Sequence, residues 1–309
     1  MCIRDRIGEA FEYSEKYNTP VLFRPTTRVC HAYASIDNCD SPSPKKYEGF
    51  VKDSKKWVIF PRLSFANHIM IEKRNVEIGK DFSTYSANKA EGVNSEKAVV
   101  TSGISYAYTK ECLKDYPDVK LIKIATAYPF PEDFVLSSLE GAKEVLCIEE
   151  LSPFIEEQIL KLAGKHGLQL KVSGKLDGKV QAGGENSTDK IAAILGDFLG
   201  KDFKAEGYDL SDAPALPVRP PVLCAGCPHR ASFYAVKQAM KGRKAYFCGD
   251  IGCYTLGNAM PLDMVDTCLC MGAGITMAQG FNHTDSDGVC FGFVGDSTFC
   301  LLYTSDAAD

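Results

Sequence analysis

The chain has 309 residues, of which 45% are hydrophobic and 24% charged, and its formal net charge at pH 7 is −5. That length suits about two domains, and the composition is ordinary for a globular protein. The weakly negative charge gives no electrostatic case for nucleic-acid binding, and no apolar run reaches the roughly 18–20 residues that span a bilayer. The N-terminus has no apolar signal core, so we expect a cytoplasmic protein with no membrane or nucleic-acid partner.

The N-terminal part predicts the end of an α/β unit. Residues 7–17 follow a helical pattern, Asn18-Thr-Pro20 breaks it, and an apolar strand is expected over 21–23. Arg28, just after that strand, is a candidate catalytic residue that could contact a substrate carboxylate, although a solvated loop explains it equally well. Residues 36–94 are expected to form a linker and a connecting helix.

Strands and helices then alternate regularly between residues 95 and 200. This rhythm predicts a parallel, doubly wound sheet with helices on both faces. Expected strands cover 97–101, 119–125, 144–149 and 168–172, and expected helices cover 106–115, a segment starting near 132, and 154–164.

A proline-rich linker over 201–221 separates this region from another α/β unit. Its expected elements, in order, are a helix over 230–240, a strand over 244–248, a helix over 272–281 and a strand over 289–294.

Three glycine-bearing motifs mark the last unit as a candidate cofactor site. Gly295-Asp296-Ser297 follows an apolar strand, and ligands of open parallel sheets bind beyond the carboxyl ends of strands. Glycine there lets the backbone approach a ligand, and Asp296 could hold a Mg²⁺ ion that binds a diphosphate. Gly249-Asp250 repeats the arrangement, and Gly272-Ala-Gly274 opens a helix whose N-terminus could bind an anion. Simple strand-ending turns are the plainer alternative for each motif taken alone.

Cysteines form a second signal in the same unit. Of the thirteen in the chain, six lie between residues 224 and 270, which favours a reducing compartment and a metal site. Cys224 and Cys227 form a Cys-x-x-Cys pair, and Cys253 follows 26 residues later. A redox pair would be expected to open a helix just after a strand, and a zinc ribbon would show a second Cys-x-x-Cys; neither pattern is present. An iron-sulfur site with a fourth ligand beyond the end of this chain is the favoured interpretation, and a zinc site and plain thiols are the alternatives. His229, next to the pair, is a candidate catalytic residue, although a lone histidine is more often structural.

Taken in order, these motifs resemble the thiamine-diphosphate-binding alpha subunit of indolepyruvate:ferredoxin oxidoreductase. The resemblance covers roughly residues 7–299. It is carried by the segments 19–29, 101–106, 219–230 (Arg-Pro-Pro-Val-Leu-Cys-Ala-Gly-Cys-Pro-His-Arg), 249–257 (Gly-Asp-Ile-Gly-Cys-Tyr-Thr-Leu-Gly) and 295–299 (Gly-Asp-Ser-Thr-Phe).

The resemblance implies several doubly wound α/β domains of the thiamine-diphosphate-dependent 2-oxoacid:ferredoxin oxidoreductase type, with the first and last truncated. Residues 1–35 would end a pyrimidine-binding domain, 95–200 would form a transketolase C-terminal-like domain, and 222–300 would be the first half of the diphosphate-binding domain. Residues 1–6 and 301–309 resemble translated sequencing-adapter sequence, and we expect them to be foreign to the parent protein.

The implied reaction is oxidative decarboxylation of an aryl 2-oxo acid to an aryl-acetyl-CoA and CO₂, with reduction of ferredoxin. The implied partners are the beta subunit of the same oxidoreductase, ferredoxin, CoA and the aryl 2-oxo acid, and this piece is expected to be inactive alone. The alternatives are a non-oxidative thiamine-diphosphate decarboxylase and a non-catalytic metal- or nucleotide-binding module.

The implied cofactors are thiamine diphosphate, Mg²⁺ and [4Fe-4S] clusters, the clusters mostly in parts of the parent chain missing here. By resemblance, Asp296 would bind Mg²⁺, while Gly272 and Cys253 would lie against the cofactor. Gly249, Asp250, Gly274, Gly295 and Ser297 are the other expected cofactor contacts. Cys224, Cys227 and Cys253 match three cluster-ligand positions of the wider family by spacing.

Overall fold

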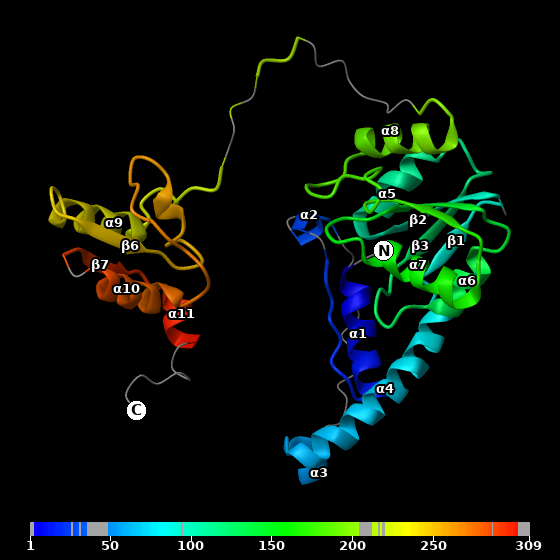
Figure 1. The fold of residues 1–309 in the computed structure, drawn as a ribbon, viewed down its shortest axis with the longest axis horizontal. Helices are drawn as coiled ribbons and strands as arrows, with labels where there is room; N and C mark the ends of the chain where they lie inside the picture. The colour runs from blue at the N-terminus through cyan, green and yellow to red at the C-terminus, as the bar shows by residue number, and fades with distance from the viewer. Residues whose placement is uncertain are drawn as a thin grey trace. The chain divides into compact units, whose positions relative to one another are not determined.

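The computed structural model describes residues 3–25, 27–30, 32–35, 49–93, 95–203, 212–215, 217, 220–285 and 287–301. The chain divides into two compact units, unit 1 (Met1–Tyr208) and unit 2 (Asp209–Asp309), each with its own sheet and apolar core (Figure 1). No helix within the described ranges is long and apolar enough to cross a membrane.

Unit 1 is built on a five-stranded sheet in the order β1-β3-β2-β4-β5. The last four strands in that order pair in parallel, which confirms the predicted parallel sheet, whereas β1 pairs antiparallel with β3 at the edge. The strands are β1 (Lys89–Glu91), β2 (Lys97–Ser102), β3 (Lys120–Ile124), β4 (Glu144–Ile148) and β5 (Lys171–Ser173).

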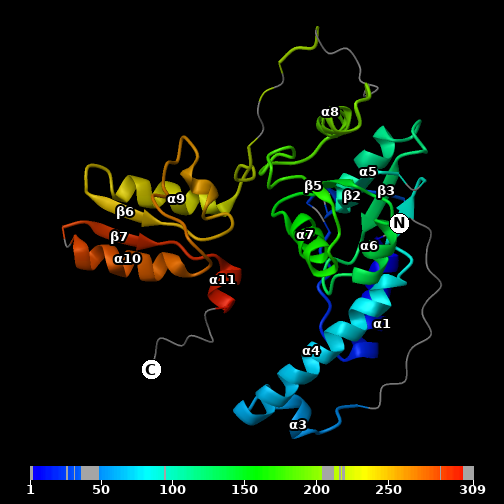
Figure 2. The ribbon, with the colours of Figure 1, turned by 45° about the vertical axis from the view of Figure 1, so that its right-hand side comes forward.

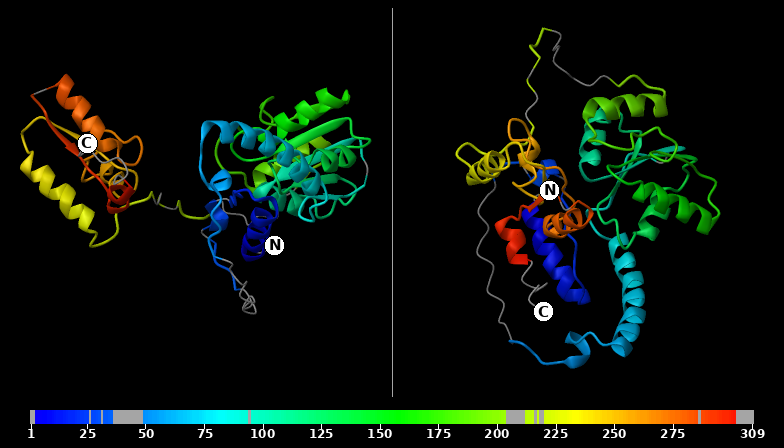
Figure 3. Two further views of the ribbon diagram at one scale, coloured as in Figure 1. Left: turned by 90° about the horizontal axis from the view of Figure 1, so that it is seen from below. Right: turned by 60° about the vertical axis from the view of Figure 1, so that its left-hand side comes forward.

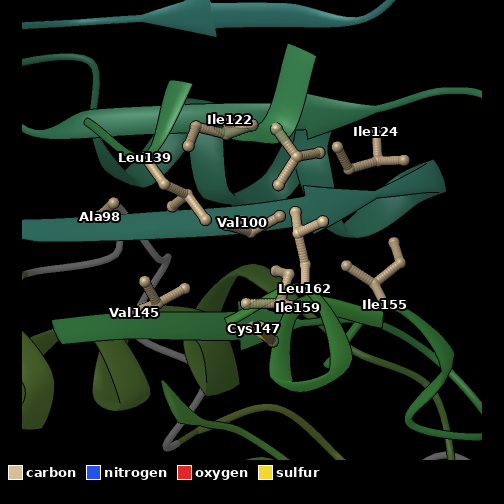
Figure 4. Close-up of a cluster of buried hydrophobic side chains, with 11 residues drawn as sticks. Ala98, Val100, Ile122, Ile124, Leu139, Val145, Cys147, Ile155, Ile159 and Leu162 are labelled. Carbon is tan, nitrogen blue, oxygen red and sulfur yellow. The ribbon is translucent and has the colours of Figure 1, made fainter. Parts of the chain in front are cut away.

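Helices cover both faces of this sheet, as a doubly wound fold requires (Figure 2). Successive strand residues point to opposite faces, so Val100 and Val99 of β2 enter different cores. Val100, Ile122 and Cys147 lie in the core closed by Ile159 and Leu162 of one helix (Figure 4). That face carries α6 (Glu132–Ser138) and α7 (Phe154–His166), and the other carries α5 (Gly103–Cys112) and α8 (Thr188–Leu199), the last an addition to the predicted elements.

A long helix, α4 (Pro61–Ser83), extends from unit 1 (Figure 3). Only Ile78 and Gly79 of its residues are buried. Its C-terminal end packs against α1 (Ile3–Tyr17), where the rings of Tyr13 and Phe82 lie 5.4 Å apart and Lys16 Nζ lies 2.7 Å from Asp81 Oδ2. The remaining helices of unit 1 are α2 (Thr27–Cys30) and α3 (Ser54–Trp57).

The structure corrects one predicted element of unit 1. Residues 21–23 form no strand, and Leu22 is almost fully exposed. A strand needs a neighbour to accept and donate its backbone hydrogen bonds, and no described residue pairs with this segment. Residues 36–48 of the expected linker and 302–309 of the expected foreign tail lie outside the described residues.

Unit 2 contains a β-α-β crossover. β6 (Ala245–Cys248) and β7 (Val289–Gly292) pair in parallel, and α10 (Ala273–Thr284) connects them. Their strand residues are mostly half-buried. On the side away from β7, the described residues give β6 only a single bridge, from Cys248 to Thr267. The other elements are α9 (Pro228–Ala239), the 3₁₀ turn η1 (Leu256–Asn258) and α11 (Asp296–Leu301), around a core of Leu223, Phe233, Met264 and Phe293.

Candidate functional site at the carboxyl edge of unit 2

The predicted glycine motifs converge at one edge of the unit 2 sheet. Because β6 and β7 run in parallel, the loops that follow them, Gly249-Asp250 and Gly295-Asp296, leave the sheet at the same edge. The crossover helix α10 begins at this edge too, with Gly272 as its N-cap in the left-handed conformation at φ 84°. We call this region the carboxyl edge.

Asp250 ties the three loops of the carboxyl edge together. Its side chain is fully buried, and its two carboxylate oxygens accept hydrogen bonds from the backbone N–H groups of Gly272 (3.0 Å) and Gly295 (2.8 Å). Burial opposes ionisation of Asp250, but the hydrogen bonds from the Thr298 hydroxyl and these amides outweigh it and hold its pKa below the usual range. The carboxylate is therefore committed to the loops, and its contribution to ligand binding would be to position them.

Two of the predicted glycines allow close packing of backbone on backbone. A Cβ on Gly274 would lie 2.9 Å from the carbonyl oxygen of Gly249, and one on Gly249 would lie 3.0 Å from the carbonyl oxygen of Tyr254. A Cβ added to Gly292 of β7 would lie 3.0 Å from the carbonyl oxygen of Gly274. These glycines let α10 sit directly on the strand ends.

The N-terminus of α9 also reaches the carboxyl edge. Cys227 is its N-cap, and the Sγ of Cys227 lies 3.2 Å from Nδ1 of His229. The His229 ring meets the Tyr254 ring edge-on at 4.7 Å between centroids, and Tyr254 in turn stacks on Phe293 at 5.3 Å. These aromatic contacts bring His229 to the loops that follow β6 and β7.

The structure does not assemble the three motif cysteines into a metal site. Within the described ranges, no three His, Cys, Asp or Glu side chains are grouped so that they could hold a metal ion. Cys224 and Cys253 are exposed thiols, and Cys227 is engaged with His229. As arranged, these thiols do not fit an iron-sulfur cluster. The cluster assignment stays a prediction from spacing, and we derive no chemical step from it.

Asp296 and Ser297 are exposed in the first turn of α11, immediately after the loop that Asp250 holds. An exposed carboxylate at this edge can bind a cation, unlike the buried Asp250. Arg28 lies in α2 of unit 1, and its side chain is outside what the structure describes. Within unit 2 the structure thus brings together the glycine motifs, His229, Cys227 and Cys253, and the part expected of Arg28 stays a prediction.

Two features of the site were missed in the sequence. Tyr254 belongs to the Gly-Asp-Ile-Gly-Cys-Tyr-Thr motif, but its role in joining His229 to Phe293 depends on contacts distant in the sequence. Thr267 has a buried hydroxyl without a hydrogen-bond partner among the described residues. The backbone carbonyl of the same residue accepts a hydrogen bond from the N–H of Gly249 at 2.7 Å. Nothing in the sequence around a single threonine in a loop would predict that its hydroxyl is buried and unpaired.

The carboxyl edge fits a diphosphate group with its Mg²⁺ ion. The unpartnered Thr267 hydroxyl offers a hydrogen bond that the protein leaves unused. The N-terminus of the twelve-residue helix α10 carries a partial positive charge that favours an anion, and the Asp250 carboxylate meets part of that charge at the N–H of the N-cap Gly272. Asp296 offers the hard oxygen that Mg²⁺ prefers.

Comparisons with known proteins agree with the motifs. The chain is similar to the protein called indolepyruvate oxidoreductase subunit IorA from Methanothermobacter thermautotrophicus, with 35% identity over 302 residues, which cover 95% of this chain and 48% of that protein. It is 34% identical to the IorA subunit of Thermococcus kodakarensis over 287 residues (88% of this chain, 44% of that protein). For IorA of Archaeoglobus fulgidus the identity is 31% over 308 residues (96% and 48%).

Two further comparisons add nothing to this. No family model matches the chain. A solved structure of 2-oxoglutarate:ferredoxin oxidoreductase from Magnetococcus marinus aligns with 14% identity over 45% of this chain and 23% of that chain, and its TM-score of 0.33 is too low to support an argument. The chain spans about half the length of the curated relatives it matches. Over nearly all of its residues, then, this chain is similar to about half of the indolepyruvate oxidoreductase subunit IorA, which confirms the resemblance inferred from its motifs.

Proposed function

We propose that the protein to which this sequence belongs catalyses the oxidative decarboxylation of aryl 2-oxo acids of the indolepyruvate class, with thiamine diphosphate as cofactor. The products would be an aryl-acetyl-CoA and CO₂, and the electrons would pass to ferredoxin. The observation that carries the proposal is the convergence of Gly249-Asp250, Gly272 and Gly295-Asp296 at one edge, in a chain that matches IorA over 95% of its length.

Each residue at the carboxyl edge has a distinct part in this proposal. Asp296 would hold Mg²⁺, and the N-terminus of α10 would stabilise the negative charge of the diphosphate. Asp250 holds the loops of Gly272 and Gly295 next to each other, so that Asp296 and the N-terminus of α10 would face the same ligand. The exposed Gly252-Cys253 turn would lie against the cofactor. When bound, thiamine diphosphate supplies the electron sink for the pair released on loss of CO₂.

His229 is the candidate for proton transfer. Its Nδ1 faces Cys227 Sγ at 3.2 Å, so Nε2 is the ring nitrogen that would exchange a proton with a substrate group. The ring is held by Tyr254, which fixes its orientation relative to the loops. Arg28, in unit 1, is proposed to contact the substrate carboxylate.

The remaining parts of the proposal concern the parent protein. A beta subunit of the same oxidoreductase and ferredoxin would be its partners, with CoA as the acyl acceptor. The chain spans about half of its relatives, and we expect this piece alone to be inactive.

The test uses the full-length parent protein, expressed anaerobically with its partner subunit. Reduction of benzyl viologen by indolepyruvate should require both CoA and thiamine diphosphate. Asp296→Ala should lower the activity and weaken thiamine-diphosphate binding, while Asp287→Ala, an equally exposed acid in the turn before β7, should change neither.

Other outcomes of this test identify the alternatives. An aldehyde product without dye reduction would mean a non-oxidative decarboxylase. Affinity for ATP or NAD without affinity for thiamine diphosphate would mean a nucleotide-binding module. In either case the proposed reaction is wrong.

A further inference from the structure

A group of lysines lies at the β1–β3 edge of unit 1, far along the sequence from the carboxyl edge. Lys89 of β1 is paired directly across from Lys123 of β3 in the antiparallel register. Paired residues share a face of the sheet, and this is the face that α5 covers, because the Lys123 ammonium lies over the ring of Tyr106 at 4.7 Å. Lys110, one turn further along α5, adds a third ammonium 5.7 Å from the same ring.

These charges are not balanced by acids. Glu91 is paired with Lys110 at 2.9 Å and also accepts a hydrogen bond from the Tyr106 hydroxyl at 2.7 Å. No other carboxylate among the described residues lies within ion-pair distance of Lys89, Lys110 or Lys123. Three ammonium groups therefore share one carboxylate, which leaves two positive charges uncompensated in a protein whose net charge is −5.

The arrangement is costly for the protein alone. Like charges directly opposite each other on neighbouring strands destabilise a sheet. Burial lowers the pKa of Lys123, and the neighbouring Arg6, Lys89 and Lys110 lower it further, while Glu91 acts in the opposite sense. An anion held between Lys89 and Lys123 would remove this repulsion.

We propose that Lys89, Lys110 and Lys123 form a binding site for the dianionic phosphate group of a phosphomonoester. The charge of the ligand follows from the two uncompensated ammonium groups. The spacing of Lys89 and Lys123 also suits one phosphate group. The Cβ atoms of an antiparallel pair lie about 5 Å apart, so the two lysine side chains can both contact the same phosphate. Arg6 adds positive charge nearby but already contacts Glu9, and the site is defined without it because it lies in the segment expected to be foreign. The site is independent of the proposed function.

The experiment is isothermal titration calorimetry of the full chain with methyl phosphate, inorganic phosphate and acetate at equal, low ionic strength. We expect methyl phosphate to bind one to one and acetate at least tenfold more weakly, because a monoanion neutralises only one of the two charges. Inorganic phosphate binding more tightly than methyl phosphate would identify free phosphate as the ligand and overturn the phosphomonoester assignment. Equal binding of acetate and phosphate would overturn the site altogether.

Variants separate the site from general charge effects. Lys123→Met keeps the aliphatic stem and removes the charge, and Lys89→Gln changes an exposed side chain, so both should fold and both should weaken binding at least tenfold. Lys114→Gln, which removes an exposed lysine just beyond α5, should leave the affinity unchanged. Wild-type affinity in Lys89→Gln and Lys123→Met, or an equal loss in Lys114→Gln, would refute the site.

A charge reversal gives a second readout that does not depend on ligand. Lys89→Glu places a carboxylate opposite Lys123, so it should abolish methyl phosphate binding and raise the melting temperature of unit 1. A lower melting temperature in a folded Lys89→Glu chain would show that Lys89 and Lys123 do not repel each other, which removes the basis of the proposal.

Discussion

Replacing Asp250 by Asn should loosen the carboxyl edge of unit 2 and leave unit 1 intact. The substitution keeps the shape of the side chain but removes its charge and exchanges one acceptor oxygen for an NH₂ group. That group then faces a backbone N–H of Gly272 or Gly295, where two donors meet and neither is satisfied.

The size of the effect follows from the bonds that are lost. A hydrogen bond to a charged acceptor contributes about 1.5–3 kcal/mol, and a buried donor left without a partner costs about 1–3 kcal/mol. We therefore expect unit 2 to lose about 3–5 kcal/mol, which raises the population of its open state by roughly 10²–10³·⁵ because 1.4 kcal/mol corresponds to a factor of ten. Asp296→Asn, at an exposed position of the same edge, should change stability by less than about 0.5 kcal/mol.

The chain contains its own probes for this measurement. Cys248 is fully buried in β6 of unit 2, and Cys147 is fully buried in β4 of unit 1. Pulsed alkylation followed by peptide mass spectrometry should show much faster labelling of Cys248 in Asp250→Asn, with Cys147 unchanged. The only tryptophan, Trp57, lies in unit 1, so its fluorescence would not report on unit 2. Unchanged labelling of Cys248 would show that Asp250 does not hold the loops.

Three further predictions concern pH, glycine packing and thiol reactivity. The pKa of Asp250 is depressed in the folded chain. Its contribution to the free energy of unfolding is therefore complete above the unfolded pKa of 3.8 and is lost as the pH falls through the folded pKa. Calorimetry should show that the difference in stability between wild type and Asp250→Asn disappears below about pH 4. Gly274→Ala should destabilise unit 2 by about 1–3 kcal/mol through overpacking, whereas Gly280→Ala in the same helix, with open space around it, should stabilise it by up to about 1 kcal/mol; equal effects in thermal melts would contradict the packing argument. Burial, with smaller contributions from Glu111 and Asp189, raises the pKa of Cys112 to about 11, so its alkylation at pH 8.5 should be far slower than that of exposed Cys224, and comparable rates would show that Cys112 is accessible.

The sequence predicts the centre of unit 1 well because its signals are local. The apolar runs at 97–101, 119–125 and 144–149 contain the largely buried strands β2, β3 and β4, and their alternation with helices leaves few topologies other than a parallel sheet. The edge strands of the sheet are harder to predict from the sequence. Residues 21–23 are apolar but have no strand to pair with in the part of the chain that the structure describes, whereas Lys89–Glu91 is polar and becomes a strand because β3 offers it an open edge.

In the candidate site, too, the sequence predicts some features and not others. The positions of Gly249-Asp250 and Gly295-Asp296 follow from strands that precede them, so their convergence was predictable. Which Asp is buried was not, because three of the groups that hydrogen-bond to the Asp250 carboxylate, those of Gly272, Gly295 and Thr298, come from segments 22 to 48 residues away. The gathering of Lys89, Lys110 and Lys123 likewise depends on strand register and helix placement, which no short motif encodes.

The small core of unit 2 has a calorimetric consequence. Among the described residues, its cluster contains four buried apolar residues, whereas the two clusters of unit 1 contain eleven and ten. The heat capacity change of unfolding follows the apolar area exposed, so unit 2 should have a shallow stability curve and a broad melting transition with little heat. A ligand that binds only the folded form would raise that transition by mass action, in proportion to the logarithm of its concentration. Heat absorbed by unit 2 would therefore register binding more sensitively than heat absorbed by unit 1.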